Sequence, residues 1–179
     1  MNELQELRTQ HYLGRAKNAV QSFLIQKLLV PKVYFDADWS GWPLDVLAID
    51  RAGVGDVHGV RLVQWEPGGR DDHGYSHRLQ EKVLAAIQEF SDFPGHFRYL
   101  AVVCTEPNKR RWIPSGAIAD RSLAPDGVGR VGLLYVNVME NDAEVEVLLK
   151  PERFRSTPQI VNLADRYVAE HTANWEVRE

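Results

Sequence analysis

A run of carboxylates is the first feature of this sequence whose residue type and spacing could support chemistry. Four aspartates lie within fifteen residues: Asp36, Asp38, Asp45 and Asp50. Asp45 opens a segment that otherwise has the composition of a buried strand, and a buried carboxylate is unfavourable unless it is hydrogen-bonded, paired or bound to a cation. Asp36, Asp38 and Asp45 are therefore candidate ligands for Mg²⁺. In the alternative, Asp45 is a turn-capping residue after Pro43, and Asp36 and Asp38 are solvated.

A short basic run beside a tryptophan is the strongest binding signal: Lys109, Arg110, Arg111 and Trp112. Cationic side chains bind phosphates and an indole stacks on a base, so the run is a candidate nucleic-acid site. Three further arginines would join it if the following hairpin folds back nearby: Arg98, Arg153 and Arg155. In the alternative, the run is a solvated loop anchored by one tryptophan.

Two tryptophans flank a Ser-Gly pair in a segment rich in turn formers, which predicts a loop. Trp39 and Trp42 would be anchors for a partner if they are exposed, because tryptophan is enriched in interface hot spots. If they are packed, they would instead cover the edge of a sheet. Both interpretations are open at the level of the sequence.

Other kinds of site have little support. His73 and His77 are four residues apart, but Gly74 lies between them, and two histidines without a third ligand are a weak zinc signal. Loop polarity and helix capping by Ser76 are favoured over zinc. Cys104 ends an apolar segment, where cysteine usually acts as a small hydrophobe. The sequence contains no nucleophile elbow, Walker loop or dinucleotide fingerprint.

Composition and net charge restrict the classes of protein to which this chain can belong. The chain has 179 residues, 44% of them hydrophobic, which is typical of one globular domain over residues 1–179. A net charge of −4 argues against a surface that is basic throughout, but it allows one local basic patch. No apolar stretch approaches the roughly 18 residues of a membrane span, so no membrane partner is expected. A single cysteine and the lack of an apolar leader predict a cytoplasmic protein.

Hydrophobic periodicity predicts an α+β chain with an α/β-like core. The core covers about residues 3–105, followed by an irregular loop over 105–129 and a hairpin and helix over 130–172. The predicted helices are 3–29, 76–90 and a last helix from about 158. The predicted strands are 33–35, 44–50, 58–65, 97–104, 132–139 and 144–149.

This order of elements resembles the core of the PD-(D/E)XK, or restriction-endonuclease-like, superfamily. The resemblance covers roughly residues 10–105, and residues 42–53, from Trp42 through Asp45, are similar to the motif that opens the family's second strand. It implies a three-layer fold, in which a central mixed sheet with an antiparallel hairpin is flanked by helices. In active members, two acids hold Mg²⁺ and a lysine on the next strand helps to activate water.

The chain departs from that motif at the positions that carry the chemistry. Arg61 stands where the resemblance implies the second acid, and Val63 where it implies the lysine. The last two turns of the first helix contain Lys17 but no acid. The resemblance therefore implies a degenerate member, in which Arg61 could form a buried ion pair with Asp45 in place of the metal. In the alternative, Arg61 faces solvent.

Three functions follow from these observations. The first is a non-catalytic binding protein on a nuclease-like scaffold, with a protein or a nucleic acid as partner and no cofactor. The second is a Mg²⁺-dependent nuclease with a rearranged site, in which Asp36, Asp38 and Asp45 act with a migrated lysine or His58. The third is an oligomeric structural module that uses an edge strand with Val145, Val147 and Leu149 on one face.

Overall fold

The computed structural model describes residues 3–50, 55–64, 72–90, 92–105, 130–155 and 157–173. The basic run at Lys109 to Trp112 lies outside these residues, and so do the side chains of His73 and His77 on the second helix. Interpretations that depend on them stay predictions.

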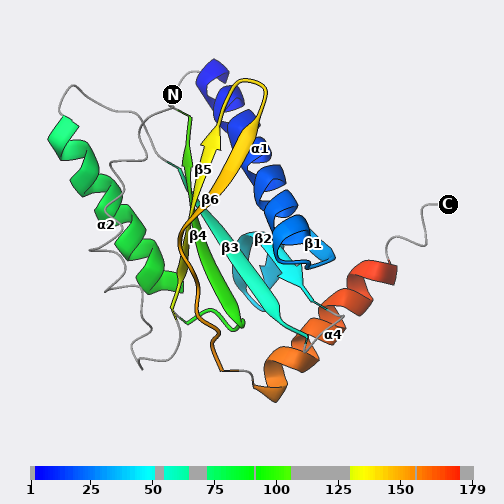
Figure 1. Cartoon of the computed structure of the whole chain (residues 1–179). Coiled ribbons are helices and arrows are strands. Elements are labelled where there is room, and N and C mark those ends of the chain that lie inside the picture. The colour runs from blue at the N-terminus through cyan, green and yellow to red at the C-terminus, as the bar shows by residue number, and fades with distance from the viewer. Residues whose placement is uncertain are drawn as a thin grey trace.

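A six-stranded mixed sheet forms the centre of the molecule, so the chain belongs to the α+β class, as predicted (Figure 1). The strands lie in sequence order across the sheet: β1 (Lys32–Trp39), β2 (Trp42–Ile49), β3 (Val57–Gln64), β4 (Phe97–Cys104), β5 (Gly132–Val138) and β6 (Ala143–Leu149). β1, β2 and β3 are antiparallel neighbours, β3, β4 and β5 are parallel, and β6 returns antiparallel to β5. Two parallel neighbouring strands must be joined by a crossover connection. Between β3 and β4 this connection contains α2 (Asp72–Phe90).

Helices cover both faces of the sheet (Figure 1). On one face, α1 (Glu3–Lys27) buries Ala16, Val20 and Leu24 against the strands, and we call this the α1-side core. On the other face, α2 and α4 (Pro158–Ala173) contribute to a second cluster, which we call the α2/α4-side core. Each helix buries one stripe of side chains, because apolar residues recur at three- and four-residue steps.

The residues that follow α1 explain where this helix ends. Leu29 has a left-handed backbone with φ of 58°, and the Val30 N–H donates to the Leu24 carbonyl at 3.1 Å. Pro31 follows, and a proline disfavours helical geometry in its predecessor. The helix therefore ends at Lys27, close to the predicted boundary at residue 29.

The segment around the two tryptophans is a tight hairpin rather than the predicted loop. Only Ser40 and Gly41 form the turn, and both have positive φ angles, 53° and 85°. Positive φ angles at both central residues are typical of the two-residue turns whose twist matches that of the hairpin strands, and glycine adopts such angles readily. Trp39 and Trp42 are consequently paired across β1 and β2.

The second hairpin also differs from its predicted alternation. A register shift lies between the pairs Leu133/Leu149 and Leu134/Val147, so one residue of β6 is extra at that point. Leu149 packs on the α2/α4-side core, Val145 packs on the α1-side core, and Val147 is 37% exposed. The three side chains therefore do not share one face, because the irregularity reverses the alternation of the strand.

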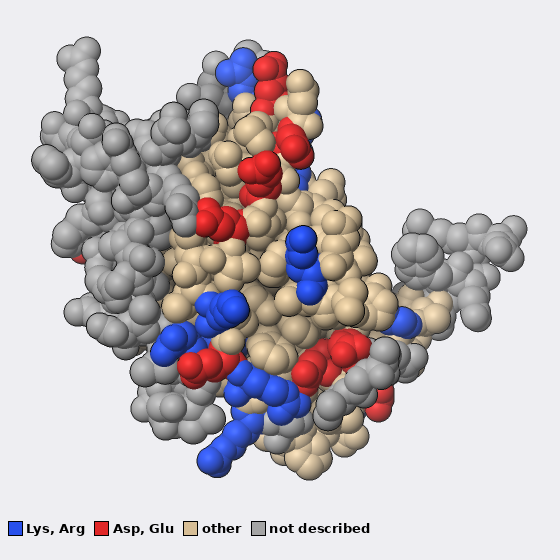
Figure 2. Space-filling model, in the orientation of Figure 1, with Lys and Arg blue, Asp and Glu red and all other residues tan. Residues whose placement is uncertain are grey.

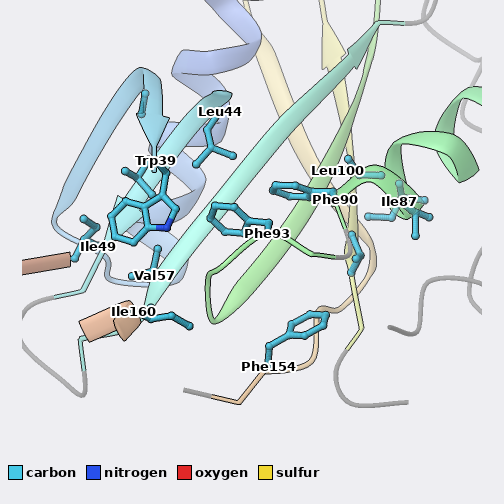
Figure 3. Packing of buried hydrophobic residues seen from close by; sticks show 14 of the residues in the cluster. Trp39, Leu44, Ile49, Val57, Ile87, Phe90, Phe93, Leu100, Phe154 and Ile160 are labelled. Atoms are coloured by element: carbon cyan, nitrogen blue, oxygen red, sulfur yellow. The ribbon is translucent and has the colours of Figure 1, made fainter. Parts of the chain in front are cut away.

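Large aromatic side chains fill the α2/α4-side core (Figure 3). Phe90 and Phe93 are fully buried and stack with ring centroids 4.9 Å apart. The Phe93 ring covers Gly59 of β3, where an added Cβ would lie 2.5 Å from a ring carbon. A side chain at Gly59 would occupy the space that this ring needs.

Candidate functional site

Asp45 lies where the pairing of β2 with β3 stops. The ladder runs from Ile49/Val57 to Val46/Val60, and Asp45 is the next residue along β2. Its Oδ2 accepts a hydrogen bond from the Leu62 N–H at 2.8 Å. The carboxylate thus supplies an acceptor for a backbone donor beyond the end of the ladder, which stabilises a buried polar group.

Lys17 of α1 provides the positive charge of the site. Its Nζ lies 3.7 Å from Asp45 Oδ1 and also donates to Asp36 Oδ1. The Lys17 side chain is only 17% exposed, whereas that of Asp36 is 73% exposed. Asp36 has a left-handed φ of 47°, an uncommon conformation that places its carboxylate on Lys17. We call Lys17, Asp36 and Asp45 the lysine–carboxylate cluster.

The predicted ion pair between Asp45 and Arg61 is not present. Arg61 Nη1 lies 3.3 Å from Glu89 Oε2 on α2, on the opposite face of the sheet from α1. Adjacent residues of a strand point to opposite faces, and Val60, next to Arg61, is part of the α1-side core. Asp45 and Arg61 are therefore separated by the sheet and have different partners.

The lysine–carboxylate cluster does not fit a resident magnesium ion. Both Asp45 oxygens have partners, and the Lys17 ammonium occupies the space between Asp45 and Asp36 where a cation would bind. Asp38 does not join the cluster, because its Oδ1 accepts from the Gly41 N–H at 2.7 Å. Among the described residues, no group of three histidine, cysteine, aspartate or glutamate side chains could hold a metal.

His58 lies on β3, and its side chain is buried and uncharged. It pairs with Ala48, three residues beyond Asp45, and its ring stacks on Phe97 at 4.7 Å. Burial lowers the pKa of His58 to about 4, against smaller opposing effects of Asp56 and Asp50. An imidazole with this pKa is uncharged at neutral pH, so it offers no positive charge to an anion there.

Val63, at the position of the expected lysine, is half-buried and packs against the α2/α4-side core. An apolar side chain in that place contributes packing and no proton transfer.

The tryptophans are part of the packing rather than free anchors. Trp39 is 1% exposed, and its Nε1 donates to the Pro94 carbonyl at 2.9 Å. Trp42 is partly buried, with its ring edge on Phe93 at 6.3 Å between centroids. The interpretation in which they cover the sheet is the one that the contacts support.

Two of the arginines that were expected to extend the basic run have structural roles. Arg98 is 8% exposed, and its guanidinium lies 3.4 Å from the centre of the Phe154 ring. Arg153 Nη2 lies 2.7 Å from Asp56 Oδ1, and Arg155 is exposed. Figure 2 shows lysine and arginine interspersed with aspartate and glutamate on the visible face, so the described residues there do not form one basic surface.

Comparison of the chain with protein-family models, curated proteins and solved structures finds no match. None of the described helices has the length and apolarity that crossing a membrane requires.

The role of Lys17 was not predicted from the sequence, although a signal for it exists. Leu13, Ala16, Val20 and Leu24 define the apolar stripe of α1, and Lys17 is four residues after Leu13 and three before Val20. A lysine on the stripe that faces the sheet needs an anionic partner or a path to solvent. The acids of the following hairpin supply that partner.

Proposed function

We propose that this chain is a non-catalytic binding protein on a restriction-endonuclease-like scaffold, whose partner is a protein or a nucleic acid. The observation that carries the proposal is the position of the Lys17 ammonium, 3.7 Å from Asp45 and in contact with Asp36. This protein-borne cation balances one of the two negative charges and occupies the position between the carboxylates that a divalent ion would need.

The scaffold is supported by the order and direction of the elements. The resemblance to the superfamily implies a long helix, an antiparallel hairpin, a crossover helix and a central strand, and α1, the hairpin of β2 and β3, α2 and β4 follow in that order. Asp45 is the fourth residue of β2, within the segment from Trp42 that is similar to the motif of that family's second strand. The catalytic residues of the motif are replaced, since Arg61 pairs with Glu89 and Val63 packs in the core.

Metal titration tests the absence of catalysis. We expect calorimetry to detect no saturable binding of Mg²⁺ or Mn²⁺ at millimolar concentration, and we expect no cleavage of DNA or RNA. Metal-dependent cleavage that is lost in Asp45→Asn would overturn the proposal. Glu146→Gln is the matched control, because it removes one negative charge from an exposed position of β6, the strand at the opposite end of the sheet from β1 and β2.

A metal-dependent nuclease with a rearranged site is the second candidate function. The observation in its favour is the set of residue types, one lysine and the carboxylates of Asp36 and Asp45, which is that of a metal-assisted hydrolase; for a metal to bind, the Lys17 ammonium would have to leave its place between them. If this candidate is correct, the wild-type protein cleaves nucleic acid in the presence of a metal, and the variant Lys17→Gln does not. The binding proposal requires that there is no wild-type activity to lose.

Substitutions in the basic run, which lies outside the described residues, test whether the partner is a nucleic acid or a protein. If the partner is a nucleic acid, replacing Lys109, Arg110 and Arg111 with glutamine should weaken binding of labelled DNA or RNA. The slope of log affinity against log salt should then fall by roughly 0.7–0.9 for each phosphate that the variant no longer binds. Unchanged affinity and slope would direct the search to protein partners.

A further inference from the structure

A hollow of about 810 Å³ lies between the first strand and the last helix. Its walls come from β1, from α4 and from Gln21 of α1, and we call it the β1–α4 hollow. The volume is within the roughly 300–1,000 Å³ typical of sites for small ligands. The lysine–carboxylate cluster adjoins it through Asp36, but the hollow is otherwise built from different residues.

The hollow follows the open edge of the sheet. In the described sheet, β1 has β2 as a neighbour on one side only. Four successive residues of β1, 33–36, line the hollow. Because successive residues of a strand point to opposite faces, a hollow that touches all four lies along the strand edge and not over one face. A group from solvent or from another molecule can therefore enter it.

Aromatic rings form one wall of the hollow. The Tyr34 and Tyr167 centroids are 5.2 Å apart, and Tyr34 is also 5.5 Å from His171. Tyr167 stacks on His171 at 3.9 Å. Phe35 also lines the hollow and is 39% exposed, but as the strand neighbour of Tyr34 it points to the other face of the sheet. The faces of tyrosine and phenylalanine rings carry negative potential and attract cations.

Among the described residues, carboxylates outnumber cations around the hollow. Asp36, Asp38 and Glu170 line it together with one described guanidinium, that of Arg166. Lys17 offsets the charge of Asp36 only in part, because it also lies beside Asp45. Asp38 and Glu170 then leave an excess of negative charge over Arg166.

The field of these carboxylates reaches the aromatic wall. The pKa of Tyr167 is raised above its usual value, first by burial and then by Tyr34, Asp38 and Glu170. Groups that oppose the ionisation of a phenol favour a positive charge beside it. The same potential repels phosphates and carboxylates, so an anionic ligand does not suit this hollow.

We propose that the β1–α4 hollow binds an organic cation, an alkylguanidinium or alkylammonium group. Its source is either a free small molecule or the side chain of an arginine or lysine on a partner. The rings of Tyr34 and Tyr167 contact the cation, and Asp38 and Glu170 balance its charge. This binding does not depend on whether the lysine–carboxylate cluster is catalytic.

Titration with N-acetylarginine methylamide tests the proposal. Backbone chemical shifts of the isotope-labelled protein should change in a saturable way at Gln21, Tyr34 and Glu170. N-acetylcitrulline methylamide is the matched probe, because its side chain has the same shape and no charge, and we expect no saturable change with it. Equal shifts with both probes, or shifts confined to residues outside the hollow, would overturn the proposal.

Two variants separate a local site from an effect of net charge. Glu170→Gln should weaken binding of the arginine probe about threefold to tenfold, since it removes one charge beside the rings. Glu146→Gln removes the same charge on exposed β6 and should leave the affinity unchanged. Equal weakening by the two variants contradicts a site at the hollow.

The source of the cation is distinguished by comparing ethylguanidinium with the peptide Gly-Ser-Arg-Ser-Gly. Tighter binding of the peptide by tenfold or more assigns the side chain of a protein partner, whereas equal affinity assigns a free small molecule. Saturation by neither cation overturns the proposal.

Discussion

Asp45 has a structural partner for each of its two side-chain oxygens. Its two oxygens bind the Leu62 N–H and lie beside Lys17. The first contact stabilises the point where β2 and β3 separate, and the second neutralises a half-buried charge.

Substitution of Asp45 should separate these contacts. Asp45→Ala leaves the Leu62 N–H without its acceptor, and we expect the free energy of unfolding to fall by about 1–2 kcal/mol. Asp45→Asn keeps an oxygen acceptor and loses only a partly exposed ion pair, so it should cost less, about 0–1 kcal/mol. Urea denaturation monitored by circular dichroism measures both. Equal losses would show that the charge, and not the hydrogen bond, is what stabilises the fold.

His58 should make stability depend on pH. Its folded pKa is about 4, below the usual 6.5, so the neutral ring is the form that the folded chain accepts. Above pH 6.5 its contribution is complete. As pH falls from 6.5 toward 4, the unfolded chain binds a proton that the folded chain does not, and stability decreases by up to about 3 kcal/mol.

The matched control for this pH effect is His58→Phe, which keeps a ring against Phe97 and Tyr99 and cannot be protonated. Unfolding by urea at several pH values should show a flatter decline in the variant over that interval. Parallel declines in the two proteins would contradict a role for His58.

At the scale of elements, β3 depends on a close approach of Phe93. Gly59→Ala should lower the free energy of unfolding by about 1–3 kcal/mol, because its Cβ would meet a buried ring that is stacked on Phe90. Gly14→Ala is the contrasting variant, since nothing lies within 4 Å of a Cβ at that exposed position of α1. It should stabilise by about 0.5–1 kcal/mol. Denaturation midpoints that move the same way in both variants would contradict this account.

At the scale of the whole molecule, the side chains of β6, at the second edge of the sheet, determine whether two copies of the chain can pair through that edge. Among the described strands, β6 ends the sheet, and it carries exposed Glu144 and Glu146 along with Val147. Charges on an edge strand disfavour pairing with another strand. We expect light scattering to give the mass of a monomer over a wide range of concentration. A dimer that Val147→Lys converts to a monomer would instead support the oligomeric function.

Local pattern predicted the elements well, and contacts between elements less well. The bounds of β4 agree with the predicted 97–104, because a continuous apolar run is visible in the chain itself. The alternation of β6 was wrong, because a register shift depends on how β5 pairs with it. The interaction of Lys17 with Asp36 and Asp45 was missed, because it joins a helix to a hairpin.

The amino-acid sequence alone determined the α+β class, the order of the elements and Asp45 as the residue to examine. Periodicity, proline and glycine act over a few residues, so these features can be inferred without coordinates. Only the tertiary structure decided that Asp45 faces Lys17, that Arg61 faces Glu89, and that β1 and α4 enclose a hollow. Each of these depends on which face of the sheet a side chain occupies and which helix covers that face, and packing between distant segments sets both.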